Sequence, residues 1–174
     1  MINDKKVINK NHILLNFIHV IIISIPFSLI TGPFIPDLSI TLVCLVFVYL
    51  SFIENMRSYY FSKFSIFFLI FYLTINLTSL LSVDPFESLK ISIVYFRYFL
   101  FSLSFWYLIK NQPEVLNNLL KSIMISMLIL ILDGFYQFYF GKNIFGWNAT
   151  GTRISSFFKD ELILGSYLSR MFPL

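Results

Sequence analysis

A short stretch near the end of the chain carries four charged side chains between two apolar runs. Arg153 comes directly before Ile154-Ser155-Ser156-Phe157-Phe158, and Lys159, Asp160 and Glu161 follow. A guanidinium stays charged, and its planar fork binds carboxylate or phosphate oxygens in pairs. From these residues alone, Arg153 is either an anion contact at a membrane surface or an ordinary solvated loop charge.

The residues that lead to Arg153 predict an irregular loop, expected over residues 141–161. Phe145 and Trp147 are aromatic residues of the kind that anchor at a membrane–water interface. Three glycines are expected to break regular structure here. They are Gly141, Gly146 and Gly151.

Two ionisable residues, Arg97 and Asp133, lie inside runs that are otherwise apolar. A central arginine costs at least ~2.5–3.5 kcal/mol on membrane-insertion scales, so it needs a partner or a ligand. At ~1.5 Å per helical residue, Arg97 and Asp133 are expected about 9 and about 10 Å below the outer ends of their runs, with Asn76 at a similar depth. Two interpretations stay open. Arg97 pairs with Asp133 or extends to the headgroups, or it lines an outward-opening cavity for an anionic head group.

Asp133 also begins a partly polar stripe. Tyr136, Gln137 and Phe140 follow it at i+3, i+4 and i+7, the spacing of one helix face. The stripe predicts that these four side chains point in one direction.

Spanning helices must position these residues. The 174 residues are 57% hydrophobic and 13% charged, whereas a globular domain is about 25% charged. Apolar runs near the ~20 residues that cross a bilayer predict an all-α, polytopic transmembrane helix bundle, in a single transmembrane region. Five spans and the start of a sixth are expected, at 13–31, 38–53, 64–82, 91–109, 119–140 and 162–174. Gly32, Pro33 and Pro36 are expected to separate the first two spans.

The distribution of charge predicts the orientation of the spans. Basic residues precede the first span and lie between the second and third and between the fourth and fifth, whereas acids prevail between the first and second and between the third and fourth. The positive-inside rule therefore predicts a cytoplasmic N-terminus and an outward loop 141–161.

The sequence also argues against several kinds of site. The one cysteine, Cys44, lies in a predicted span, so no disulfide framework or thiolate metal site is expected. His12 and His19 are interpreted as packed residues, and we find no glycine-rich phosphate loop. We expect no metal, no cofactor and no nucleic-acid partner.

Several short motifs follow one another in order from about Leu80 onward. They are Ser82-Val83-Asp84-Pro85, Ser88-Leu89, Arg97, Asp133-x-x-Tyr136-Gln137, Gly141, Ile144-Phe145-Gly146, Arg153-Ile154-Ser155 with Phe158 and Asp160, and Leu164-Gly165-Ser166-Tyr167-Leu168. In this order and spacing, the chain resembles O-antigen ligases and O-antigen polymerases up to their sixth span.

The resemblance implies an inverting, metal-independent glycosyl transfer in lipopolysaccharide synthesis, at the outer face of the bacterial inner membrane. The donor would be a glycan on undecaprenyl diphosphate, and the acceptor lipid A-core or the growing glycan, among membrane lipids. Positive charge would stabilise the leaving diphosphate. By similarity, Arg153 is expected to contact the diphosphate, with Arg97 as a second contact. Asp133, Gln137 and Asp160 are expected in support.

The family pattern also includes a later outward loop with further arginines and a histidine proposed as general base, which this sequence lacks. We therefore expect the N-terminal portion of a longer protein, with no catalytic residue of its own. Two alternatives remain open. A lipid-linked sugar flippase or transporter fragment predicts internal repeats and broken helices, and a small structural membrane protein predicts a complete final span.

Overall fold

The computed structural model describes residues 2–54, 56–149, 153–158 and 163–171, and it shows a helical chain. None of these described residues belongs to a strand. Among them are five helical segments long and apolar enough to cross a membrane. These segments are His12–Thr31, Phe34–Ile53, Lys63–Leu80, Pro85–Asn111 and Glu114–Phe140. The all-helical prediction is confirmed, and the orientation of the segments stays a prediction.

The elements in chain order are α1 (Ile2–Ser28), η1 (Leu29–Thr31), α2 (Phe34–Ile53), α3 (Arg57–Tyr60), α4 (Lys63–Leu80), α5 (Pro85–Val94), α6 (Phe96–Asn111), α7 (Glu114–Phe140), η2 (Ser156–Phe158) and α8 (Leu164–Met171). They form two compact units. Unit 1 comprises Met1–His19 and Leu38–Pro113, and unit 2 comprises Val20–Asp37 and Glu114–Leu174. Each unit is described by itself below.

The helix α2 begins at Phe34, earlier than the predicted start at residue 38. Pro36 was expected to break the chain, but it lies in the first turn of this helix. Proline is tolerated there because the first backbone N–H groups of a helix have no intrahelical partner. The break is at Gly32, whose φ of 115° favours glycine. The second apolar helix therefore has 20 residues, a full spanning length.

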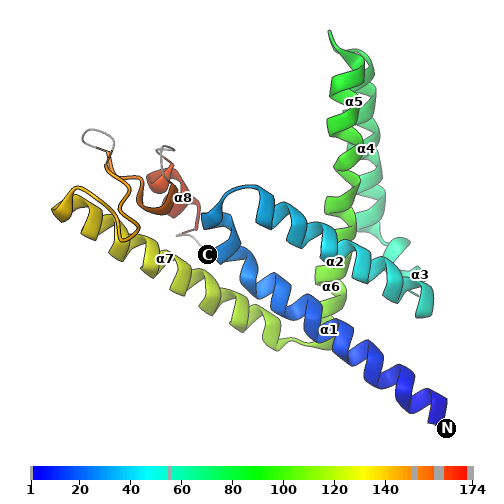
Figure 1. Cartoon of the computed structure of the whole chain (residues 1–174). Coiled ribbons are helices and arrows are strands. Elements are labelled where there is room, and N and C mark those ends of the chain that lie inside the picture. The colour runs from blue at the N-terminus through cyan, green and yellow to red at the C-terminus, as the bar shows by residue number, and fades with distance from the viewer. Residues whose placement is uncertain (1, 55, 150–152, 159–162, 172–174) are drawn as a thin grey trace. The chain divides into compact units, whose positions relative to one another are not determined.

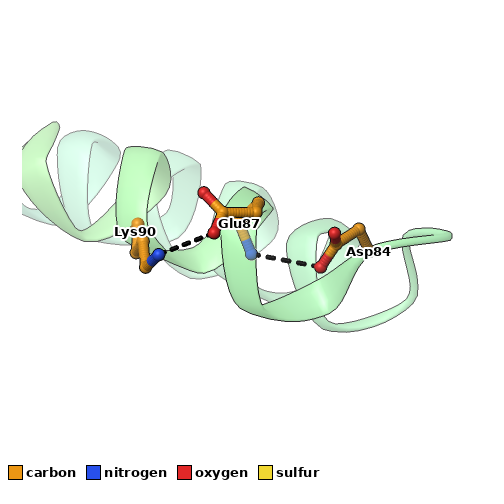
Figure 2. A network of polar contacts seen from close by, with 3 residues as sticks. All are labelled: Asp84, Glu87 and Lys90. Carbon is orange, nitrogen blue, oxygen red and sulfur yellow. Dashed lines mark hydrogen bonds and ion pairs between the residues drawn. The ribbon is translucent and has the colours of Figure 1, made fainter.

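The fourth apolar segment begins at Pro85 and not at the predicted residue 91. Asp84 Oδ1 accepts a hydrogen bond of 3.3 Å from the backbone N–H of Glu87, and Pro85 occupies the first turn. An N-cap aspartate followed by proline is a strong helix start. Lys90 Nζ lies 2.6 Å from Glu87 Oε1 (Figure 2), an exposed ion pair that adds little stability.

In unit 1, α4 and α5 lie side by side as an antiparallel pair (Figure 1). The Ser92 hydroxyl donates a hydrogen bond of 3.0 Å to Asn76 Oδ1, and Asn76 Nδ2 donates to the carbonyl of Tyr72 at 2.7 Å. The predicted polar residue of the third span therefore has its partners within this pair of helices.

Unit 1 contains a small polar cluster at the C-terminal end of α6. His19 Nδ1 lies 2.6 Å from Gln112 Oε1, and Gln112 Nε2 donates a hydrogen bond of 2.7 Å to Asn16 Oδ1. These contacts join α1 to the residue that follows α6. His19 is thus a half-buried, hydrogen-bonded residue, which agrees with its interpretation from the sequence.

Candidate functional site

The C-terminal part of α7 buries a polar face in unit 2. Asp133 and Gln137 are fully buried, and Gly134 is buried beside them. Tyr136 and Phe140 are 39% and 65% exposed, so only the two polar members of the predicted stripe are buried. The two polar side chains turn toward a chain segment that covers this face of α7, whereas the two rings lie off it and contact each other, with centroids 4.5 Å apart.

The chain turns back along the end of α7 immediately after the helix (Figure 1). Gly141 and Gly146 have φ values of 73° and 86°, which permit the tight turns there. The Asn143 N–H donates to the Trp147 carbonyl at 2.9 Å, and the Ala149 N–H donates to the Gly141 carbonyl at 2.9 Å. We call residues 141–149 the first segment and residues 153–158 the second segment.

Asp133 bonds to both segments. Its Oδ1 accepts a hydrogen bond of 3.0 Å from the backbone N–H of Ile144 in the first segment. Its Oδ2 accepts a hydrogen bond of 2.5 Å from the hydroxyl of Ser156 in the second segment. A buried carboxylate is tolerated only when its oxygens have such donors.

Gln137 connects the same two segments. Its Oε1 accepts hydrogen bonds from the backbone N–H groups of Ser155 and Ser156, at 3.0 and 2.7 Å. Its Nε2 donates to the carbonyl of Trp147 at 3.3 Å. The side chain amide therefore holds the backbone of the second segment against the first.

Asn143 is the third side chain with one partner in each segment. Its Oδ1 accepts a hydrogen bond of 2.8 Å from the Trp147 N–H, and its Nδ2 donates to the Ser156 carbonyl at 3.1 Å. We call Asp133, Gln137 and Asn143 the bridging side chains. All three are buried.

Ser156 is where the bridging side chains meet. Its N–H bonds to Gln137, its hydroxyl to Asp133 and its carbonyl to Asn143. Its φ of 51° is the one left-handed value among the described non-glycine residues, and such a conformation costs about 1–2 kcal/mol. The three hydrogen bonds offset that cost.

Gly134 allows the second segment to approach α7 closely. A Cβ atom at this position would lie 3.3 Å from Leu164 Cδ2 and 3.6 Å from Ile154 Cγ2. The first distance is tighter than a usual Cβ contact, so a side chain here would require the Leu164 side chain to shift by a few tenths of an ångström, whereas the second distance is an ordinary contact.

Arg153 is exposed at the start of the second segment. Within the described part of the chain, its side chain forms no hydrogen bond or ion pair. The structure thus brings three of the predicted residues, Arg153, Asp133 and Gln137, into one loop assembly. Asp160 lies outside the described residues.

Arg97 lies in unit 1, at the start of α6. Measured from Pro85, it is about 18 Å along the apolar segment at ~1.5 Å per residue, deeper than the predicted 9 Å. Its Nη2 donates to the Tyr98 hydroxyl at 3.3 Å, and its guanidinium carbon is 5.1 Å from the centre of that ring. The pairing of Arg97 with Asp133 stays a prediction, and both Asp133 oxygens already accept hydrogen bonds within unit 2.

Unit 2 also contains an aromatic groove of about 400 Å³. Its walls come from the end of α1, η1, α7 and both loop segments. The lining residues are Phe27, Ile30, Thr31, Ile129, Phe145, Trp147 and Phe157. The Phe145 ring centroid is 5.5 Å from that of Trp147 and 5.3 Å from that of Phe157. An apolar groove in the unit that carries Arg153 suits a ligand with an apolar chain and an anionic head.

Asn143 and Ser156 were not predicted as hydrogen-bonding residues of the site. An asparagine between two glycines does signal a turn, but their common partners lie in segments that the sequence separates. Within the described residues, no group of three or more His, Cys, Asp or Glu side chains could hold a metal ion.

The described residues define a helical protein with apolar helices that are compatible with a membrane. One of these helices, α7, carries buried polar side chains that bind the loop segments after it. Comparisons with protein-family models, curated proteins and solved structures find no match to the chain.

Proposed function

We propose that the chain is the N-terminal portion of an O-antigen ligase- or polymerase-like glycosyltransferase, which transfers or polymerises a glycan from undecaprenyl diphosphate at the outer face of a bacterial inner membrane. One observation carries the proposal. Asp133, Gln137 and Ser155 belong to the motifs that resemble the family and lie in one hydrogen-bonded loop assembly, and Arg153, from the same motifs, begins the segment that contains Ser155. Motif residues that gather in three dimensions support a common role better than sequence order alone.

In the proposed reaction, a hydroxyl of lipid A-core or of the growing glycan attacks the anomeric carbon of the donor sugar. The bond from that carbon to the diphosphate oxygen breaks with inversion, and the lipid diphosphate leaves with its added negative charge. Arg153 stabilises this charge through bidentate hydrogen bonds. Arg97 is the second proposed contact. The general base comes from the later part of the longer protein, and no metal or cofactor takes part.

The aromatic groove supports the same substrate. An isoprenoid chain is branched and apolar. Aromatic walls can bury such a chain without leaving a buried polar group that lacks a hydrogen bond. We assign the isoprenoid units nearest the diphosphate to this groove.

The test uses the full-length protein in cells that lack their own copy. Arg153→Ala is expected to abolish glycan transfer without reducing the protein in the membrane, and Arg153→Lys to restore part of it, because lysine keeps the charge but not the fork. Asn148→Ala, an exposed change in the same loop, serves as the matched control. Unchanged surface glycan in Arg153→Ala would remove this residue from the mechanism.

The same assay separates the two reactions. Loss of a ligase leaves lipid A-core without any glycan, whereas loss of a polymerase leaves lipid A-core with a single repeating unit. Gel electrophoresis of lipopolysaccharide distinguishes the two patterns.

A transporter of lipid-linked sugars is the second candidate, because the fourth apolar segment is interrupted. The α5 and α6 helices meet at Tyr95, where Tyr95 N–H donates to the Ser92 carbonyl at 3.2 Å and Tyr98 N–H donates to the Tyr95 carbonyl at 3.0 Å. Interrupted helices bind substrates in many transporters. This candidate would be favoured if the reconstituted protein moved the lipid-linked sugar from one leaflet of a liposome membrane to the other without forming a new glycosidic bond.

A further inference from the structure

We propose that the three bridging side chains are positioning residues, which hold the backbone at Arg153 so that its guanidinium can bind the lipid diphosphate. Asn143 is the one of the three that the sequence did not predict. This inference rests on the proposed function of Arg153. It assigns a role to three side chains that do not contact the substrate themselves.

The first step of the argument is the double attachment of each bridging side chain. Asp133, Gln137 and Asn143 each have at least one partner in the first segment and at least one in the second. The two segments are therefore held in one register, and a shift of either by one residue would break contacts of all three side chains.

The second step is the short distance along the chain from this attachment to Arg153. Three residues extend over at most ~10–11 Å, at ~3.3–3.6 Å each. Ser156 is fixed through its N–H, hydroxyl and carbonyl, so the Arg153 backbone stays within that distance of a fixed point. An arginine on a held backbone loses less conformational freedom when it binds an anion, which improves affinity.

The third step of the argument is that α7 and the two loop segments are joined by buried polar contacts and not by apolar packing alone. A carboxylate and two carboxamides are costly to bury in an apolar helical unit, and apolar packing alone can stabilise a loop. Hydrogen bonds to particular backbone groups add what apolar packing lacks, namely a defined register. Because all three side chains are buried, that register is their contribution to the site.

The experiment measures binding of undecaprenyl diphosphate to the full-length protein in detergent micelles by native mass spectrometry, with undecaprenol as the probe without charge. Asn143→Ala is expected to weaken binding of the diphosphate probe about tenfold, the loss of roughly one charge-assisted hydrogen bond. Binding of undecaprenol is expected to stay unchanged. In the double variant with Arg153→Ala, Asn143→Ala is expected to add nothing further.

Conservative and control variants distinguish positioning from general damage. Asp133→Asn keeps an acceptor for the Ile144 N–H and a donor for the Ser156 hydroxyl oxygen, so it is expected to bind the diphosphate probe more tightly than Asp133→Ala. Asn148→Ala is the control from the same loop. Should Asn143→Ala fail to accumulate, Gln137→Glu keeps the acceptor for the second segment, loses the donor to the Trp147 carbonyl, and is expected to show the same dependence on Arg153.

The outcomes separate the inference from the proposed function. Diphosphate binding that is unaffected by Arg153→Ala would overturn both the Arg153 contact and the inference. Binding that needs Arg153 but is unaffected by Asn143→Ala would overturn the inference alone. Equal losses from Asn143→Ala with and without Arg153 would also overturn it, because a positioning residue acts only through the group that it positions.

Discussion

Replacing Asp133 by asparagine and by alanine separates hydrogen bonding from charge at the C-terminal end of α7. Alanine removes the acceptors of the Ile144 N–H and of the Ser156 hydroxyl, which lie 3.0 and 2.5 Å from the carboxylate oxygens. Asparagine keeps an oxygen for the Ile144 N–H, and the Ser156 hydroxyl can rotate to accept from the new amide. Only the charge is lost in that variant.

The expected magnitudes differ widely. Hydrogen bonds to a charged group contribute about 1.5–3 kcal/mol each, so Asp133→Ala is expected to destabilise the loop assembly by about 3–6 kcal/mol. Lower values, near ~0.6 kcal/mol for each bond, are typical where the unfolded chain in the membrane finds other partners. Asp133→Asn is expected to cost less than about 1.5 kcal/mol, because both partners stay satisfied.

Thermal unfolding of the purified protein in detergent, with proteolysis of residues 141–158 as a local measure, tests this prediction. An Asp133→Asn variant as unstable as Asp133→Ala would refute the hydrogen-bonding role, because it would mean that the charge itself is required. Recovery of stability in the double variant Arg97→Ala/Asp133→Ala would then identify an ion pair between the two spans.

Three further predictions follow from unit 2 and its loop. Ser156→Gly and Ser156→Ala both lose the hydroxyl, but glycine accepts a φ of 51°, so the glycine variant is expected to be more stable by about 1 kcal/mol in thermal unfolding; an equally stable alanine variant would contradict the left-handed conformation. Gly134→Val is expected to cost about 1–3 kcal/mol, because Leu164 Cδ2 is only 3.3 Å from the added Cβ, and an unchanged melting temperature would show that α8 does not pack there. Asn148→Cys is expected to react with a membrane-impermeant maleimide applied from outside, whereas the buried Cys44 stays unlabelled; labelling only after cell lysis would reverse the predicted orientation.

Hydropathy predicted the helices well and their ends less well. Length and apolar content decide whether a segment can span a bilayer, and these are properties of the sequence alone. The ends depend on local chemistry. Pro36 was treated as a break although a first helical turn accepts proline, and the N-cap Asp84 starts α5 before the first apolar residues that a hydropathy pattern detects.

The candidate site was predicted in part, for a physical reason. Asp133 and Gln137 stood out because polar side chains in an apolar helix need partners. Their partners are mostly backbone groups of the loop segments, and a backbone N–H or carbonyl has no signature in the sequence. Residue types alone could therefore offer only Arg97 as a partner for Asp133, in one of the two interpretations left open, because a guanidinium is visible in the sequence and a backbone group is not. Asn143 was missed because its role depends on a register that only folding creates.

The double attachment of the bridging side chains also determines how the loop opens. If one segment alone were released, Asp133, Gln137 and Asn143 would each lose a hydrogen bond to that segment. Each such loss is costly because the three side chains are buried. Partial detachment is therefore unfavourable, and the two segments should detach together as one cooperative unit. The amide protons of Ile144, Trp147, Ser155 and Ser156, all held by the bridging side chains, should consequently exchange with solvent at a common opening free energy, distinct from that of the α7 backbone.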